Sequence, residues 1–101
     1  MRHAAAAINN ATEKIDILIN NAAIMACPYA KTEDGIESQF GTNYIGHFLL
    51  TNLLLERVQA AKERARIVNL TSAGSAIGEI NFDDVNFDVS AICLSVLKIR
   101  Y

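Results

Sequence analysis

Two short apolar runs on either side of a long helical pattern constrain the fold of this chain more than any other feature. Ile15–Asn20 and Ala65–Thr71 are apolar at their centres and show no alternation of polar and apolar residues. Such runs, rich in β-branched residues, are typical of strands covered on both faces of a parallel sheet. The pattern from Ile36 through Ala61 is helical. The order strand, helix, strand predicts a βαβ crossover with parallel strands.

The segments before the central helix are predicted from their periodicity. Ala4, Ile8, Ala11 and Ile15 recur at helical spacing, so the chain is expected to open with a short amphipathic helix. Residues 21–31 have no periodicity and contain the single proline of the chain, which predicts a loop.

The start of the central helix carries two competing capping signals. Asp34 and Glu37 stand three residues apart, as in a capping box, while Thr32 is the alternative cap. Gly41 and Gly46 lie inside the helical pattern, where each costs about 1 kcal/mol relative to alanine. We therefore expect close approach of another backbone or a ligand at these glycines.

Composition sets limits on size, partners and location. The 101 residues support one domain, and 51% of them are hydrophobic, with a mean hydropathy of +0.20. The net charge of −2 with no basic cluster argues against nucleic acid or an anionic membrane as partner. No apolar stretch is long enough for a membrane span or suited to an export signal, which predicts a cytoplasmic protein. Cys27 and Cys93 have no metal-binding spacing and are expected to be small buried thiols, so no metal is predicted.

Polar clusters follow both predicted strands. Asn20 and Asn21 end the first run, and Thr71 and Ser72 end the second. Ligands of open α/β sheets collect beyond the carboxyl ends of the strands. The two clusters are therefore expected to face one crevice.

Three motifs resemble those of the short-chain dehydrogenase/reductase family. Asn20-Asn21-Ala22-Ala23 is similar to the family's N-N-A-G motif, with alanine in place of the glycine. The run from Asn43 to Phe48 is similar to its N-x-x-G-x-F segment, and the run from Arg66 to Ser72 resembles the strand that ends in its catalytic serine. All three occur in family order over about fifty residues, and Ile80–Phe87 looks like the retinol-dehydrogenase-like branch.

The resemblance implies a fold and a set of roles. The fold would be α/β, a partial Rossmann-like doubly wound parallel sheet, with residues 1–101 as one partial dinucleotide-binding domain. Asn20, Asn21, Ala22 and Ala23 would lie along an NAD or NADP cofactor. Ser72 would hydrogen-bond the substrate carbonyl or hydroxyl.

Asn43 would hold a proton-relay water in the family's arrangement. Each of these polar residues also has a simpler interpretation. The asparagine pair can be a strand-ending turn, Asn43 a satisfied helix residue, Ser72 a turn residue and His47 a helix-face residue.

Two parts of the family pattern are absent from this sequence. No Gly-x-Gly occurs, so the phosphate-binding turn is missing, and none of Tyr29, Tyr44 and Tyr101 is followed by lysine at the fourth position. The tail 89–101 departs from the family altogether. These absences predict an inactive segment of an oxidoreductase that acts on an alcohol or carbonyl.

Two other functions remain open. The chain can be a non-catalytic interaction fragment that pairs with another chain, or with itself, through uncovered sheet edges. It can also be an enzyme of unfamiliar chemistry that uses Ser72 and Asn43 with groups from a partner chain.

Overall fold

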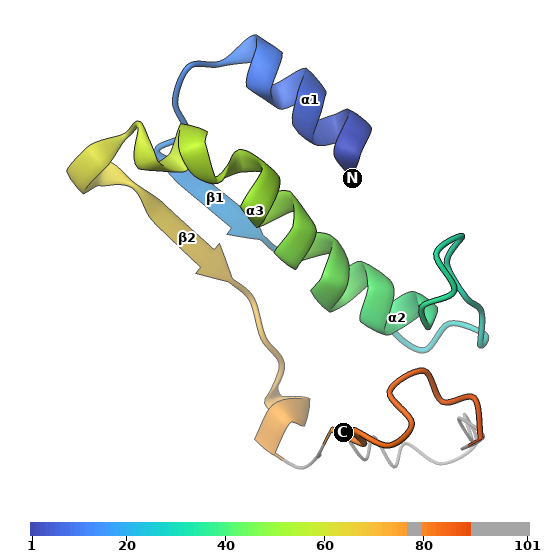
Figure 1. Cartoon of the computed structure of the whole chain (residues 1–101). Coiled ribbons are helices and arrows are strands. Elements are labelled where there is room, and N and C mark those ends of the chain that lie inside the picture. The colour runs from blue at the N-terminus through green and yellow to red at the C-terminus, as the bar shows by residue number, and fades with distance from the viewer. Residues whose placement is uncertain (77–79, 90–101) are drawn as a thin grey trace.

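The computed structural model of the chain describes residues 1–76 and 80–89, and its core is a βαβ unit preceded by a helix (Figure 1). In chain order the elements are helix α1 (Arg2–Ala11), strand β1 (Ile17–Asn20), helix α2 (Ser38–Phe40), π-helix η1 (Gly41–Ile45), helix α3 (Gly46–Gln59), 3₁₀-helix η2 (Lys62–Arg64), strand β2 (Arg66–Asn69) and 3₁₀-helix η3 (Ala73–Ala76). Of the tail 89–101, which is predicted to depart from the family pattern, residues 90–101 lie outside the described residues.

The two strands pair in parallel, as the strand–helix–strand order predicts. Ile17 lies opposite Arg66, and the register continues to Asn20 opposite Asn69. The crossover between them is the continuous helical stretch from Ser38 to Gln59. The prediction of an incomplete Rossmann-like α/β sheet is thereby confirmed at its central crossover.

Both long helices lie on the same side of this sheet. Helix α3 packs against β1, and α1 lies alongside α3 (Figure 1). Asn9 and Arg57 join the two helices, because the Asn9 Nδ2 donates to the Leu53 carbonyl at 3.1 Å and the Arg57 guanidinium donates to the Asn9 carbonyl at 3.2 Å. Among the described residues, the buried apolar side chains are those of Ala5 on α1, Leu54 and Val58 on α3, and Ala61 just after α3.

The opposite face of the sheet is uncovered in the described part of the chain. Alternation along the strands directs Leu18 and Asn20 toward α3 and directs Ile17 and Ile19 away from it. Ile17 and Ile19 are 59% and 58% exposed, and Val68, which pairs with Ile19, is 42% exposed. The apolar pattern of these strands is typical of burial on both faces of a complete sheet, whereas in the described residues only one face is covered, because both helices lie on the same side.

The cap of the central helix differs from both predicted alternatives. Glu37 itself occupies the N-cap position, and its carboxylate accepts the backbone N–H groups of Gln39 at 2.8 Å and Phe40 at 2.7 Å. The predicted cap Thr32 instead closes the preceding turn, where its hydroxyl accepts the Ile36 N–H at 3.2 Å. A carboxylate at the first turn is favourable because the helix dipole is positive there.

Gly41 starts the π-helical turn and permits a close contact. A Cβ atom on Gly41 would lie 2.8 Å from the Thr32 methyl carbon, a distance at which something must move. The expectation that another backbone or a ligand approaches closely is therefore wrong for Gly41, because the close neighbour is a side chain. π-Turns inside α-helices occur frequently at functional sites.

None of the helices within residues 1–76 and 80–89 is both long enough and apolar enough to cross a membrane.

We expect the uncovered sheet face to drive self-association of the isolated chain. Replacing Ile17 and Ile19 together by threonine keeps the β-branched shape but adds a hydroxyl to a face that would be buried between copies. Burial of one such apolar side chain contributes about 1.5–3 kcal/mol, so the double variant should associate at least ~10-fold more weakly in light scattering. Leu55→Ala, which removes exposed apolar surface from α3 instead, is the control. Equal association of all three proteins would contradict the role of this face.

Candidate functional site

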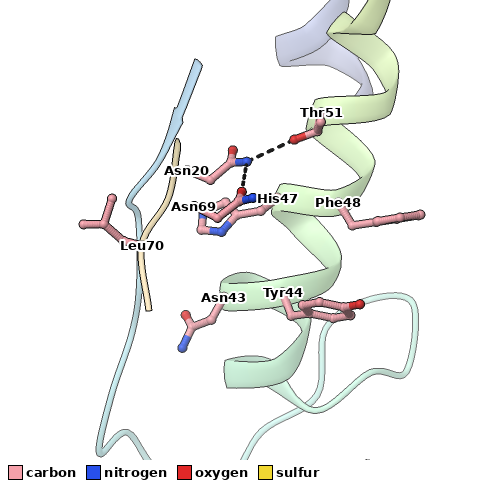
Figure 2. A pocket seen from close by; sticks show the side chains of 8 residues that line it. All are labelled: Asn20, Asn43, Tyr44, His47, Phe48, Thr51, Asn69 and Leu70. Carbon is pink, nitrogen blue, oxygen red and sulfur yellow. Dashed lines mark hydrogen bonds between the residues drawn. The ribbon is translucent and has the colours of Figure 1, made fainter. Parts of the chain in front are cut away.

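A cleft lies where the carboxyl ends of both strands meet the first turns of α3. It has a volume of about 280 Å³. Figure 2 shows the lining residues, which are Asn20, Asn43, Tyr44, His47, Phe48, Thr51, Asn69 and Leu70. The position of this cleft agrees with the rule that open α/β sheets bind ligands beyond the carboxyl ends of their strands.

A buried asparagine holds the three walls of the cleft together. Asn20 is 3% exposed, and its Nδ2 donates to the Thr51 hydroxyl at 3.0 Å and to the Asn69 Oδ1 at 2.7 Å (Figure 2). One side-chain amide thus joins β1, β2 and α3. The Asn20 Oδ1 is also buried, and it has no hydrogen-bond partner in the described part of the chain.

Asn69 and Thr51 were not recognised as site residues in the sequence. A signal for Asn69 exists, because the two strands have the sequences ILIN and RIVN and both end in asparagine. In a parallel pair these terminal residues lie opposite one another, as the register shows. Thr51 has no comparable signal, because the rotation of α3 over the sheet brings it to Asn20.

The four residues predicted to bind a cofactor fall into two groups. Asn20 uses both hydrogens of its amide nitrogen within the protein, so its side chain holds the sheet. Asn21, Ala22 and Ala23 are exposed on the loop after β1, and the Asn21 N–H donates to the Ile19 carbonyl at 3.1 Å. Their small or polar side chains leave the backbone accessible, which fits an extended ligand laid along this edge of the sheet.

Asn43 fixes the loop that leaves β1. Its Oδ1 accepts the Ile24 N–H, and its Nδ2 donates to the Ile24 carbonyl, both at 2.9 Å. Asn43 lies in the π-helical turn, on the cleft side of the helix (Figure 2). The structure therefore brings Asn43 and Asn20 to one cleft, where Asn43 clasps the backbone just beyond the predicted cofactor loop.

Ser72 lies beyond the cleft lining, in the turn that follows β2. Its Oγ accepts the Gly74 N–H at 3.2 Å, and its carbonyl accepts the Ser75 hydroxyl at 2.7 Å. Because the Ser72 Oγ acts as an acceptor toward Gly74, its own hydrogen is oriented away from that bond. Ser72 is exposed and follows Leu70, a residue of the cleft rim, by two positions.

His47 also lines the cleft, on the same helix as Asn43. Within the described ranges 1–76 and 80–89, no three His, Cys, Asp or Glu side chains are grouped closely enough to hold a metal ion. The expectation of a buried thiol is wrong for Cys27, which is half-buried because it lies on the loop after β1, with its Sγ 4.0 Å from the Ser38 hydroxyl. Cys93 lies outside the described residues.

A charged cluster lies near the start of the central helix. Lys31 forms an ion pair with Asp88, and the Tyr29 hydroxyl donates to the Asp88 carboxylate at 3.1 Å. The hydrogen bond to Asp88 raises the pKa of Lys31, and the same bond lowers the pKa of Asp88. Partial desolvation, followed by the bond to Asp88, raises the pKa of Tyr29. All three groups are exposed, so the ion pair is screened by solvent.

The fold and the motifs agree with a known family. The family model described as short chain dehydrogenase matches residues 1–83, and the chain belongs to this family. Members of the family are oxidoreductases that generally use NAD or NADP.

The individual relatives show which branch of the family this chain resembles. The chain is 49% identical to human retinol dehydrogenase 13 over 105 aligned positions, which cover 98% of this chain and 31% of that protein. It is 56% identical to mouse retinol dehydrogenase 12 over 73 positions, covering 72% of this chain and 23% of that protein. The chain therefore spans less than a third of the length of these relatives, and the resemblance to the retinol-dehydrogenase-like branch is confirmed.

A solved structure has the same fold. The crystal structure of an uncharacterised protein from Mycobacterium paratuberculosis matches with a TM-score of 0.68 and 44% sequence identity. The match covers 84% of this chain and 30% of the other chain.

Removing the Asn20 amide should loosen the fold at the cleft. In Asn20→Ala the half-buried Thr51 hydroxyl and the Oδ1 of the exposed Asn69 both lose their donor, and the two lost hydrogen bonds together contribute about 1–3 kcal/mol. We expect the free energy of unfolding, from urea denaturation followed by circular dichroism, to fall by about that amount. Asn52→Ala is the control, because Asn52 is exposed and bonds only to Phe48 of its own helix among the described residues. An equal effect of both substitutions would contradict the bridging role of Asn20.

The contact of Asp88 with Lys31 should depend on pH at both extremes. Asp88 has a pKa lowered from 3.8, so its contribution is present above 3.8 and is lost as the pH falls through the lowered value. Lys31 has a pKa raised from 10.5, so its contribution is present below 10.5 and is lost as the pH rises through the raised value. Asp88→Asn should abolish the acid transition in the nuclear magnetic resonance shifts of Tyr29. An unchanged transition would show that another carboxyl controls it.

Proposed function

We propose that this chain is the central segment of an NAD(P)-dependent oxidoreductase that interconverts an alcohol and a carbonyl compound. The observation that carries the proposal is the convergence of the family's asparagines on one cleft, with the serine strand at its rim. Because the relatives are named retinol dehydrogenases, a retinoid-like apolar alcohol is the proposed substrate class.

The reaction requires a place for a hydride, a proton and a developing charge. Oxidation of the alcohol breaks its carbon–hydrogen bond, whose hydride a bound nicotinamide would take up. It also breaks the oxygen–hydrogen bond, whose proton would go to the tyrosine of the family's Tyr-x-x-x-Lys segment, which this sequence does not contain. Asn21, Ala22 and Ala23 would hold the cofactor along the edge after β1. The Ser72 Oγ accepts the Gly74 N–H, so its own hydrogen would be directed into a hydrogen bond with the substrate oxygen. Such a bond is strongest when charge develops on that oxygen.

Asn43 supports this arrangement because it holds the loop after β1 in place. Its clasp on Ile24 holds the loop that begins with the proposed cofactor residues. An amide oxygen has a second lone pair, so the Asn43 Oδ1 can accept a relay water in addition to the Ile24 N–H.

The chain taken alone is proposed to be inactive. The sequence has no tyrosine followed at the fourth position by lysine, and therefore no proton acceptor of the family's kind. The alternative is a non-catalytic fragment that binds another chain, and the exposed apolar face at Ile17, Ile19 and Val68 favours it. Both proposals use the same described structure, and enzyme assays separate them.

Restoring the missing family segments should produce turnover. A fusion with a glycine-turn βαβ unit before Met1 and a Tyr-x-x-x-Lys helix in place of 89–101 should oxidise an apolar alcohol. The unaltered chain should show no absorbance change of NADH or NADPH. In the active fusion, Ser72→Ala should lower kcat by about 10²–10³-fold, the usual effect of losing one donor to a developing oxyanion. Cofactor affinity should change little, because this bond acts mainly in the transition state.

Ser75→Ala is the matched control for that experiment, because Ser75 lies in the same turn and its hydroxyl bonds to the Ser72 carbonyl. Its kcat should fall far less than that of Ser72→Ala. Unchanged turnover in Ser72→Ala would overturn the assignment of the catalytic serine.

A further inference from the structure

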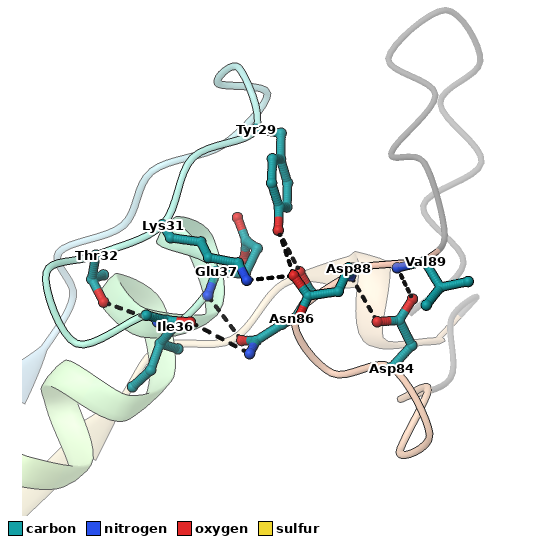
Figure 3. Close-up of polar contacts among 10 residues, drawn as sticks. Tyr29, Lys31, Thr32, Ile36, Glu37, Asp84, Asn86, Asp88 and Val89 are labelled. Carbon is teal, nitrogen blue, oxygen red and sulfur yellow. Dashed lines mark hydrogen bonds and ion pairs between the residues drawn. The ribbon is translucent and has the colours of Figure 1, made fainter.

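The segment 80–89 returns from the end of β2 to the loop before the central helix, and its contacts there are polar (Figure 3). The Asn86 Oδ1 accepts the Glu37 N–H at 3.0 Å, and the Asn86 Nδ2 donates to the Gly35 carbonyl at 3.5 Å. The Tyr29 hydroxyl donates to the Asn86 carbonyl at 3.2 Å. Asn86 therefore binds a stretch that lies 49 to 57 residues earlier in the sequence.

The Glu37 N–H is the backbone group of the N-cap residue, which a complete capping box would satisfy. In a capping box, the side chain at the N3 position reaches back and accepts the N–H of the N-cap residue. With Glu37 as N-cap, the N3 residue is Phe40, which has no acceptor. The helix therefore makes only half of a capping box from its own residues. The Glu37 carboxylate accepts the Gln39 and Phe40 N–H groups, and the reciprocal bond is missing locally.

We propose that Asn86 is a positioning residue that completes this capping box from a distant part of the chain. Its side-chain oxygen takes the place of the absent N3 acceptor and fixes the Glu37 backbone. Glu37 is 2% exposed, so its carboxylate is held in the interior by the N–H groups it accepts. A buried carboxylate is tolerated only with such fixed donors, which makes the orientation of the Glu37 backbone consequential.

The hydrogen bond from the Glu37 N–H to Asn86 is connected to the candidate site through the central helix. The helix that starts at Ser38 passes through the π-helical turn containing Asn43 within two turns. Asn43 in turn holds Ile24, after the proposed cofactor residues. Asn86 thus connects the segment that follows the serine strand with the helix that carries Asn43. This functional consequence rests on the proposed function, whereas the capping contact does not.

Other residues hold Asn86 in place. Lys31 and Tyr29 bind Asp88, and the Asp84 carboxylate accepts the Asp88 N–H at 2.7 Å and the Val89 N–H at 3.2 Å (Figure 3). The turn closed by Asp84 is therefore anchored on the loop through Asp88, two residues after Asn86.

Amide hydrogen exchange resolved by residue, on the full chain, tests the proposal. In Asn86→Ala the Gln39, Phe40 and Ile24 amides should exchange about five-fold faster, the effect expected for losing one helix-capping bond. Asn81→Ala is the matched control, because Asn81 lies in the same segment but its side chain bonds only to the Asp83 N–H among the described residues. It should leave those three amides unchanged.

The rescue uses the capping box itself. Phe40→Gln places an acceptor at N3, so in that background Asn86→Ala should change the same amides less than about two-fold. The proposal would be overturned by an undiminished effect of Asn86→Ala in the Phe40→Gln background, by an equal effect of Asn81→Ala, or by a lack of protection of these amides in the unaltered chain. The readout is independent of catalysis. An inactive fusion with a confirmed Asn86 effect would therefore reject only the proposed function.

Discussion

The Asn20 side chain is the interaction on which the described structure most depends. A two-stranded sheet with helices on one face has little apolar area to bury, and only four apolar side chains of the described part are buried. The hydrogen bonds of one interior amide to Thr51 and Asn69 add directional contacts among both strands and the helix. Polar networks of this kind specify a unique arrangement when their members are satisfied. The unpaired Asn20 Oδ1 remains a cost within this arrangement.

The central helix shows a second constraint, which is the crowding around its first turns. Gly41 leaves room for the Thr32 methyl group, and the helix widens into a π-turn after its first three residues, Ser38–Phe40. Asn43 lies in this turn and bonds the Ile24 backbone through both ends of its amide. The irregular geometry therefore occurs where the helix approaches the loop from β1, and a regular, uncrowded helix would not need glycine there.

The uncovered sheet face bears on both functional proposals. Ile17, Ile19 and Val68 present an apolar surface on strands that lie within the part of the chain matched by the family model. For an oxidoreductase segment this surface is where further layers of the protein would pack, and for an interaction fragment it is where a partner would bind. The chain spans less than a third of the length of its retinol dehydrogenase relatives. The surface and the cleft therefore both bear on which of the two proposed functions applies.

The sequence by itself determined the βαβ order, the parallel strands and the family, because those depend on local periodicity and on short motifs such as Asn20-Asn21-Ala22-Ala23. It also predicted that polar residues after the strands lie at one edge. The tertiary structure decided which partners those residues have. Asn20 meets Thr51 through the rotation of α3, and Glu37 meets Asn86 across 49 residues of sequence. Such contacts depend on how elements pack in space, and no local pattern in the chain encodes them.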